Sequence, residues 1–319
     1  MKKIVIAGDM LDAGFASLVD KFIVVRPPKG RDFTREELFE EIKDADALLA
    51  FFTAKVDKEL IDKGEKLKII ANFGVGYDKI DWEYAAEKGI VVTNTPDPVT
   101  IPTAELAMGL MLDISRKIAF LDREMRNNEN YKWDILSNLG VTLHGKTLGI
   151  FGMGRIGKEV AKRAQSFGMK IIYHNRTQLA SVEQQSLGAK YVSFEELLQQ
   201  SDFLSINAPS TPQTRGVFTL ESFKLMKPTS IVVNTARGDL IKEQDLIFAL
   251  KNNIIRGAAL DVYEQGDGNI SKELFELDNV VLVPHIGTQT VDARIEMGLY
   301  SSENIILFFE GKKPLSQVN

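Results

Sequence analysis

The chain of 319 residues contains no cysteine. This absence excludes disulfide bonds, a thiolate nucleophile and any metal site built on cysteine ligands. It also fits a reducing compartment, so the sequence predicts a cytoplasmic protein. The apolar run that follows Met1-Lys2-Lys3 is too short for a signal peptide and predicts a first strand instead.

Long apolar runs and an excess of positive charge are missing as well. No apolar run approaches the roughly 20 residues that a membrane-spanning helix needs, which predicts no membrane partner. The formal net charge of -5 argues against a nucleic-acid partner. The remaining composition, 44% hydrophobic and 26% charged, is that of an ordinary globular protein, and the length allows two domains.

Histidine is scarce, and its three positions are His144, His174 and His285. No HExxH run and no paired histidine and carboxylate spacing occur, so no metal site is predicted. His144 lies in a Gly/Lys loop and is interpreted as a solvated residue. His174 ends an expected strand and is predicted to line the adenosine edge of a bound nucleotide rather than to do chemistry.

Short apolar strands alternate with helical stretches, which is the pattern of a parallel α/β sheet. The first series of expected strands is Ile4–Ala7, Phe22–Val25, Ala47–Phe51, Lys68–Ala71 and Ile90–Thr93. The second series is Thr147–Phe151, Lys170–His174, Phe203–Ile206, Ser230–Asn234, Gly257–Asp261 and Val280–Val283. Helical spacing is expected over Thr34–Ile42, Asp81–Lys88, Thr103–Arg126 and Thr290–Glu310. The fold class is therefore predicted to be α/β, with two doubly wound, Rossmann-like parallel sheets.

The last expected helix, Thr290–Glu310, cannot form a domain alone and is predicted to return to the N-terminal half. The chain is therefore divided into a discontinuous substrate domain, 1–99 plus 288–319, and a dinucleotide-binding domain, 100–287. Ligands of such folds bind at the carboxyl ends of the strands, so the active site is expected in the cleft between the two domains.

A glycine-rich run, Gly152-Met-Gly154-Arg-Ile-Gly157, follows one of these strands and opens a helical pattern. The first glycine makes a tight turn, the second lets the backbone approach a pyrophosphate, and the third lets helix and strand pack closely. The helix N-terminus then offers free N–H groups and a positive dipole end to the anion. This run predicts that the chain binds a dinucleotide.

The end of the next strand indicates which dinucleotide is bound. Sites that prefer NAD(H) carry an acid there for the ribose hydroxyls, whereas a nearby arginine accommodates a 2′-phosphate. This chain has Asn175-Arg176-Thr177 at that place and no acid. NADP(H) is therefore the predicted cofactor, with NAD(H) as the alternative.

Polar side chains also follow several other strands, where loops face the ligand crevice. Arg237 follows Ile231–Val233, and its planar fork suits a carboxylate; Gly238 beside it is expected to let backbone and ligand approach. His285 follows Val280–Val283 and can move a proton near neutral pH. These two are the predicted catalytic residues.

With these residues in place, the chain resembles the D-isomer-specific 2-hydroxyacid dehydrogenases, in the branch of glyoxylate/hydroxypyruvate reductases and phosphoglycerate dehydrogenases. The motifs that carry the resemblance are Asn72-Phe-Gly-Val-Gly-Tyr-Asp78, Thr93-Asn-Thr-Pro96, Thr103-Ala-Glu105, Leu148-Gly-Ile-Phe-Gly-Met-Gly-Arg-Ile-Gly157, Asn234-Thr-Ala-Arg-Gly238, Gly257-Ala-Ala-Leu-Asp-Val-Tyr263 and Pro284-His-Ile-Gly287.

The resemblance implies hydride transfer between a nicotinamide and C2 of a small 2-oxo acid, which yields the D-2-hydroxy acid. Arg237 would hold the substrate carboxylate, His285 would exchange the proton, and the backbone amides near Val75 and Gly76 would complete the carboxylate pocket. The cofactor contacts implied besides those of the glycine run and of Asn175–Thr177 are Thr103, Arg155, Ile156, Asn207, Ala208, Pro209, Thr214, Thr235, Ala236, Arg237, Asp261, His285 and Gly287.

One departure from the family pattern concerns the acid that pairs with the catalytic histidine. The family carries a glutamate shortly after the Asp-Val-Tyr motif, whereas counting from Asp261 reaches Gly266 in this chain. Asp267 is the predicted partner of His285, and Glu264 is the alternative. A carboxylate beside the histidine would raise its pKa and fix its tautomer.

Other functions remain open from the sequence. A phosphoglycerate dehydrogenase without a regulatory domain and a dinucleotide-sensing binding protein are the alternatives to a 2-oxo acid reductase. By family analogy the helix Thr103–Arg126 is expected to take part in a homodimer, although its Leu106, Leu110 and Ile114 spacing equally fits core packing.

Overall fold

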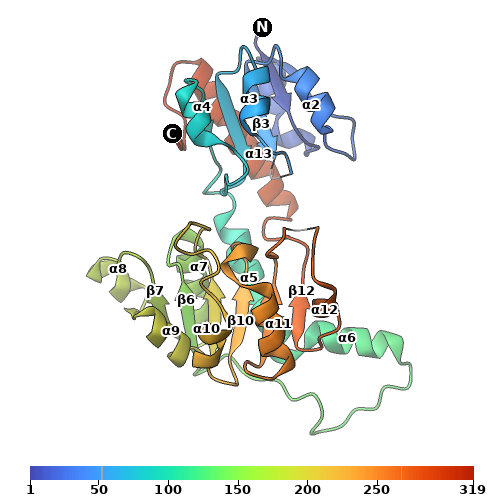
Figure 1. Ribbon diagram of the computed structural model, residues 1–319, viewed down its shortest axis with the longest axis vertical. Helices are drawn as coiled ribbons and strands as arrows, with labels where there is room; N and C mark the ends of the chain where they lie inside the picture. The colour runs from blue at the N-terminus through green and yellow to red at the C-terminus, as the bar shows by residue number, and fades with distance from the viewer. Residues whose placement is uncertain (52, 267) are drawn as a thin grey trace. The chain divides into compact units, whose positions relative to one another are not determined.

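The computed structural model describes residues 1–51, 53–266 and 268–319 and divides into two compact units (Figure 1). Unit 1 comprises Met1–Pro102 and Thr288–Asn319, and unit 2 comprises Thr103–Gly287. The sequence placed the boundary between residues 99 and 100. In the structure the two units divide between Pro102 and Thr103, inside helix α5 (Thr100–Arg116).

Unit 1 is built on a five-stranded parallel sheet in the order β2-β1-β3-β4-β5. Its strands are β1 (Lys3–Ile6), β2 (Ile23–Val25), β3 (Ala47–Phe51), β4 (Ile69–Phe73) and β5 (Val91–Thr93). Every residue of β3 and β4 is buried, as in parallel sheets that are covered on both faces.

Helices cover the sheet of unit 1. They are η1 (Asp12–Gly14), α1 (Ala16–Val19), α2 (Arg35–Glu41), α3 (Lys58–Lys63), α4 (Trp82–Glu87) and α13 (Val291–Phe309). Reciprocal hydrogen bonds between Thr34 and Glu37 form a capping box that fixes the start of α2. The last helix, α13, packs against β3 and β4 and contributes Met297 and Ile305 to the core of unit 1.

Unit 2 is built on a seven-stranded parallel sheet in the order β12-β11-β10-β9-β6-β7-β8. Its strands are β6 (Thr147–Phe151), β7 (Lys170–His174), β8 (Ala189–Tyr191), β9 (Phe203–Ile206), β10 (Ile231–Asn234), β11 (Gly257–Leu260) and β12 (Val280–Leu282). The edge strand β8 has only three residues, and one of them is an exposed lysine. No apolar run in the sequence indicates this strand.

Hydrophobic clusters lie on both faces of this sheet. One contains Met111 of α5 and Val160 of α7, and the other contains Leu197 of α9, Phe223 of α10 and Leu246 of α11. The helices of unit 2 after α5 are α6 (Ile118–Asn127), α7 (Arg155–Ser166), α8 (Ser181–Ser186), α9 (Phe194–Gln200), α10 (Leu220–Leu225), η2 (Gly238–Leu240), α11 (Glu243–Lys251) and α12 (Lys272–Phe275). The predicted doubly wound α/β fold is thus confirmed.

The single helix expected over Thr103–Arg126 is wrong, because the chain breaks at Lys117 into α5 and α6. Lys117 has a left-handed backbone, with φ of 57°. The carbonyl of Ser115 accepts the N–H of Val141 at 2.8 Å, and the Asp113 carboxylate accepts the N–H of Ala119 at 2.7 Å. These two contacts take the partners that a continuous helix would need, so the helix ends and a new one begins.

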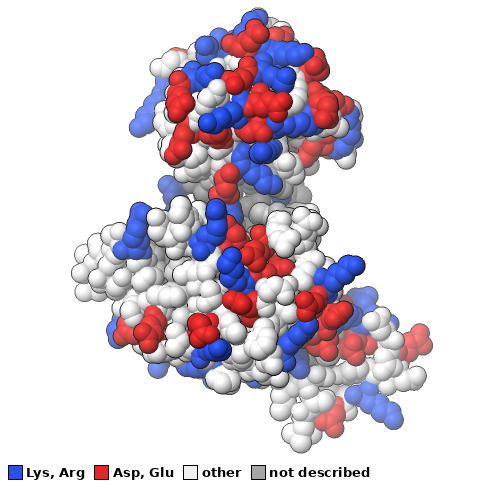
Figure 2. All heavy atoms as spheres, in the orientation of Figure 1, with Lys and Arg blue, Asp and Glu red and all other residues white. Residues whose placement is uncertain are grey.

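The surface drawn in Figure 2 differs between the two units. Acidic and basic side chains are interspersed over unit 1, while broader uncharged areas cover unit 2. Mixed charges of this kind create no extended field of one sign. Among the helices of the described residues, none is long and apolar enough to cross a membrane.

Candidate active site

The glycine-rich turn joins β6 to α7, as the sequence predicts. Gly152 has φ of +98°, and a Cβ at this position would lie 2.5 Å from the backbone nitrogen of Ala208. A Cβ at Gly157 would overlap the carbonyl oxygen of Gly152. A Cβ at Gly154 would instead meet no atom within 4 Å, so open space lies beside this glycine at the start of α7.

The strand end that carries the cofactor choice also supports this turn. The side-chain oxygen of Asn175 accepts the N–H of Met153 at 2.6 Å, and the carbonyl of His174 accepts the N–H of Gly152 at 3.0 Å. Arg176 and Thr177 are exposed. The sequence had counted Asn175 among the cofactor-binding residues, and its bond to the turn is visible only in the structure.

His174 itself is packed rather than presented to solvent. Its ring stacks on Phe151 and Tyr191, and its Nδ1 lies 2.9 Å from the carbonyl oxygen of Val192.

Two buried polar atoms point to a ligand at the ends of β9 and β10. In the part of the chain that the structure describes, Asn207 Oδ1 and Thr235 Oγ1 have no hydrogen-bond partner. Buried polar atoms normally find one, so these atoms fit polar groups of a bound molecule. With the open space beside Gly154 at the start of α7, they fit a dinucleotide.

The expected cofactor contact of Thr214 finds a different partner here. Its hydroxyl donates to the carbonyl of Pro209 at 2.7 Å and accepts the N–H of Thr211 at 2.8 Å. Thr214 therefore forms hydrogen bonds within the loop after β9. Pro209, in the same loop, is exposed.

Arg237 lies between β10 and the short helix η2, at the carboxyl edge of the sheet. Asn234, the last residue of β10, donates to the carbonyl of Arg237 at 2.9 Å and accepts the N–H of Ala236 at 3.0 Å. A Cβ at Gly238 would overlap the backbone of Tyr263. Glycine at position 238 thus allows a close approach to the backbone of Tyr263, and the expected approach of a ligand stays a prediction.

His285 lies after β12, with β11 between it and the Arg237 loop. Its backbone is left-handed, with φ of 55°, which costs a non-glycine residue free energy. Asp261, which follows β11 and is buried, accepts the N–H of Ile286 at 2.6 Å and that of Gly287 at 3.0 Å. Asp261 was expected to contact the cofactor; its carboxylate holds the histidine loop.

Thr103 joins the same group of contacts. Its hydroxyl is buried and donates to the carbonyl of Gly287 at 3.4 Å. Thr103 therefore contacts Gly287, which belongs to the loop that carries His285. Both residues were expected near the cofactor.

The candidate acids for pairing with His285 fall in the loop after β11. Asp267 lies outside the described residues. Glu264 accepts the N–H of Glu243 at 2.8 Å and pairs with Lys242 at 3.2 Å, so both of its carboxylate oxygens are engaged at the start of α11. Burial raises the pKa of Glu243, although the N–H groups of Glu264 and Ser271 oppose this by donating to its carboxylate.

In unit 1, the loop after β4 carries the expected substrate amides. The side-chain nitrogen of Asn72 donates to the carbonyls of Gly74 at 2.8 Å and of Gly76 at 2.7 Å. Because peptide bonds are trans, the N–H groups of Val75 and Tyr77, which follow these carbonyls, face away from Asn72. Within the described chain, the N–H groups of Val75 and Gly76 donate no hydrogen bond, and Val75 is exposed.

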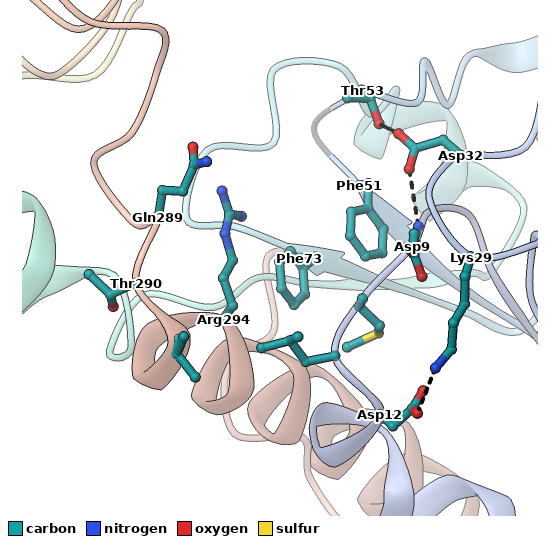
Figure 3. Close-up of a pocket in the computed structure, with 13 residues that line it drawn as sticks. Asp9, Asp12, Lys29, Asp32, Phe51, Thr53, Phe73, Gln289, Thr290 and Arg294 are labelled. Atoms are coloured by element: carbon teal, nitrogen blue, oxygen red, sulfur yellow. Dashed lines mark hydrogen bonds and ion pairs between the residues drawn. The ribbon is translucent and has the colours of Figure 1, made fainter.

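A cavity of about 600 Å³ opens beside the strand ends of unit 1, and Figure 3 shows its lining. Phe51 and Phe73, the last residues of β3 and β4, stack at 4.6 Å. Asp32 accepts the N–H of Asp9 at 3.1 Å and the hydroxyl of Thr53 at 2.7 Å, which ties the loops after β1 and β3 together. Arg294 of α13 points into this region, and its burial lowers its pKa.

The sequence had not assigned Asp32 or Arg294 to any site. Both lie outside the strand-end pattern, in a loop before α2 and on a helix that begins after the histidine loop. No spacing rule connects them with β3 or β4. Among the described residues, no cluster of three or more histidine, aspartate or glutamate side chains is arranged to hold a metal.

Comparisons with known proteins agree with this geometry. The family described as D-isomer specific 2-hydroxyacid dehydrogenase, NAD binding domain, matches residues 108–287. The glyoxylate reductase of Thermococcus litoralis is 47% identical over 92% of this chain and 87% of its own.

Two solved structures resemble the whole chain. The glyoxylate reductase from Paecilomyes thermophila is 36% identical with a TM-score of 0.89, covering 99% of this chain and 98% of that one. The NADPH-dependent glyoxylate/hydroxypyruvate reductase from Sinorhizobium meliloti, in complex with NADP and malonate, is 31% identical with a TM-score of 0.86, covering 99% and 96%. The chain therefore belongs to the D-isomer-specific 2-hydroxyacid dehydrogenase family.

Proposed function

We propose that this oxidoreductase reduces glyoxylate or a similarly short 2-oxo acid, such as hydroxypyruvate, to the D-2-hydroxy acid. The observation that carries the proposal is the placement of Arg237 and His285 on loops that flank one buried segment, Asp261–Tyr263, at the carboxyl edge of unit 2. The cation of Arg237, which can bind a carboxylate, and the proton donor His285 are then positioned by the same buried segment. Relatives named glyoxylate reductase add support.

Each residue has a defined task in this reaction. The guanidinium of Arg237 binds the substrate carboxylate and polarises the carbonyl to be reduced. His285 donates a proton to the oxygen as negative charge develops on it, and accepts one in the reverse direction. The free N–H groups of Val75 and Gly76 also bind the carboxylate. The nicotinamide dinucleotide, held at Gly152–Gly157, supplies the hydride.

NADP(H) is the proposed cofactor, with NAD(H) as the alternative. Asn175 ends β7 without a negative charge, and the exposed Arg176 follows it directly. A guanidinium there attracts a 2′-phosphate, and no acid repels it. The related reductase from Sinorhizobium meliloti is described as NADPH-dependent.

The acid that supports His285 is proposed to be Asp267. Glu264 is the weaker candidate because Lys242 and the N–H of Glu243 engage its two carboxylate oxygens. An aspartate side chain is shorter than the family's glutamate, so the loop has to bring it closer.

We also propose that the protein forms a homodimer through α6 and the segment after it. No residue of α6 is buried, although Ile118 and Met125 lie on it. Trp133, Ile135 and Leu136 in the following segment are at least 70% exposed. An apolar surface of this extent usually meets a partner, and sedimentation of the purified protein tests for the dimer. The cytoplasmic location stays a prediction from composition.

A turnover assay tests the main proposal. Glyoxylate, hydroxypyruvate and pyruvate are offered with NADPH and with NADH, and cofactor oxidation is followed. We expect reduction of glyoxylate with a higher kcat/KM for NADPH. The His285→Ala variant should lose about a thousandfold or more in kcat, while the matched control His144→Ala, an exposed loop histidine, should stay within about twofold.

The alternatives give different results in the same assay. Cofactor binding without turnover of any short 2-oxo acid would favour a dinucleotide sensor. A clear advantage for NADH would contradict the cofactor proposal, and unchanged activity in Asp267→Ala would contradict the choice of acid.

A further inference from the structure

Tyr263 touches the supports of both proposed catalytic residues. It lies two residues after Asp261, and only 3% of its surface is exposed. Its backbone lies against Gly238, directly after Arg237, and its hydroxyl lies against the end of the strand that leads to His285. None of the patterns read from the sequence assigns a role to this side chain.

The contact on the Arg237 side is between backbones. A Cβ at Gly238 would overlap the carbonyl group of Tyr263, so the loop can sit where it does only with glycine at 238. Backbone atoms cannot swing aside as a flexible side chain does. The position of the Arg237 loop is therefore set by the backbone of Tyr263.

The contact on the His285 side is a hydrogen bond. The hydroxyl of Tyr263 donates to the carbonyl of Val283 at 2.9 Å. The same carbonyl accepts the N–H of His285 at 3.2 Å, which closes the turn around the left-handed histidine. The phenol of Tyr263 thus fixes the Val283 carbonyl, which accepts the N–H of His285 in this turn. The carboxylate of Asp261 binds the N–H groups of Ile286 and Gly287, which follow.

We propose that Tyr263 is a positioning residue that holds the Arg237 loop through its backbone and the His285 turn through its hydroxyl. The inference rests on the proposed function for the roles of Arg237 and His285. Its two halves act on different residues, so they separate in kinetics: disturbing the hydroxyl alters proton exchange, and disturbing the backbone contact alters substrate binding.

Tyr263→Phe tests the first half, because it removes the hydroxyl and keeps the ring. We expect kcat to fall about tenfold, with the KM for glyoxylate and the dissociation constant of NADPH within about twofold of wild type. The matched control is Tyr173→Phe, which removes another buried tyrosine hydroxyl of unit 2, one that accepts the N–H of Leu179. Its thermal stability should fall comparably while kcat stays unchanged.

A measurement without turnover separates this inference from the proposed function. The chain has only three histidines, so NMR can follow the ring resonances of each imidazole. In Tyr263→Phe the ring resonances of His285 should shift, because its turn loses a support, while those of His144 and His174 should stay unchanged. A wild-type protein that lacks reductase activity would refute the proposed function and leave these spectra readable.

Gly238→Ala tests the second half. The added methyl group must displace the Arg237 loop from Tyr263, so the KM for glyoxylate should rise at least tenfold, with a smaller change in the ring resonances of His285. The inference is overturned if Tyr263→Phe changes neither kcat nor the ring resonances of His285. It is also overturned if Gly238→Ala folds and binds glyoxylate like wild type.

Discussion

The two sheets are alike at their amino edges and different at their carboxyl edges. Asp46 and Asp202 directly precede β3 and β9, and each accepts the N–H of the first residue of the neighbouring strand, Lys3 or Thr147, at 2.8 Å. The backbone N–H groups of both aspartates also donate to those same residues. Neither aspartate lines the cavity of unit 1, and both join neighbouring strands, so this shared arrangement serves the fold.

At the carboxyl edges each unit uses an asparagine in its own way. Asn72 donates to two carbonyls, and among the described residues the N–H groups of Val75 and Gly76 in its loop donate no hydrogen bond. Asn175 instead accepts the N–H of Met153 and supports a turn that opens into a helix of 12 residues. The first arrangement suits a single carboxylate and the second a pyrophosphate, which also gains from the helix dipole. Because of this difference, we expect the chemistry at the carboxyl edges.

The largest effect is expected from a substitution at the carboxyl edge of unit 2. In Gly152→Ala the methyl group meets the backbone of Ala208, and alanine disfavours φ of +98°. We expect NADPH affinity to fall more than about a hundredfold and the melting temperature to drop. Gly154→Ala is the control for folding, because its methyl group enters open space and should leave the melting temperature unchanged. Wild-type binding by Gly152→Ala would contradict the role of this turn.

The next largest effect is expected from a substitution at the carboxyl edge of unit 1. Asn72→Ala leaves the carbonyls of Gly74 and Gly76 without their donor, at a cost of about 1–3 kcal/mol, and frees the loop to turn. The KM for glyoxylate should rise about ten- to fiftyfold, while the dissociation constant of NADPH stays unchanged. Steady-state kinetics and a fluorescence titration measure the two constants. Equal losses of both would show that the two edges do not have separate tasks.

A smaller effect sharpens the role of Asn175. Asn175→Asp keeps an oxygen that accepts the N–H of Met153 but adds a negative charge beside the exposed Arg176. The ratio of kcat/KM for NADPH to that for NADH should fall about tenfold, because the charge repels a 2′-phosphate and can bind ribose hydroxyls. Asn175→Ala, which loses the bond to the turn, should instead weaken both cofactors. An unchanged ratio in the aspartate variant would place the 2′-phosphate elsewhere.

The smallest effect concerns an amino edge. Burial opposes ionisation of Asp202, but Lys227 and the N–H of Thr147 outweigh it and hold its pKa below the usual range. A depressed pKa stabilises the fold above the ordinary aspartate pKa, and this contribution disappears as the pH falls through the lower value in the folded protein. Asp202→Asn should therefore cost about 0.5–1 kcal/mol of unfolding free energy at pH 7.

Denaturant unfolding at pH 7 and at pH 3 measures this cost, which should shrink at the lower pH. The kinetic constants should match those of wild type. A cost that is the same at both pH values would show that the charge of Asp202 is not its source.

Much of this site could be predicted because polar residues directly follow apolar strands. Arg237 and His285 were found in that way, and the glycine spacing located the turn after β6. Such patterns specify which residues reach the carboxyl edge. They do not specify which neighbour each residue contacts, because those contacts join strands that are far apart in the chain. For this reason the bond from Asn175 to Met153 and the support that Asp261 gives to His285 were not foreseen.

The failures have similar causes. The helix expected over Thr103–Arg126 has suitable spacing throughout, and contacts from Val141 to Ser115 and from Ala119 to Asp113 end it early. Strand β8 is too short and polar to show an apolar run. Arg294 and Asp32 reach the cavity of unit 1 from elements that no strand pattern marks.

The left-handed backbone of His285 decides which substitutions at this position suit the fold best. Glycine and asparagine adopt this conformation more readily than histidine does, so a His285→Gly or His285→Asn protein should keep the loop with less strain than the natural one. Such a chain would gain stability while it loses the proposed proton donor, so the most stable residue at position 285 and the proposed catalytic one differ.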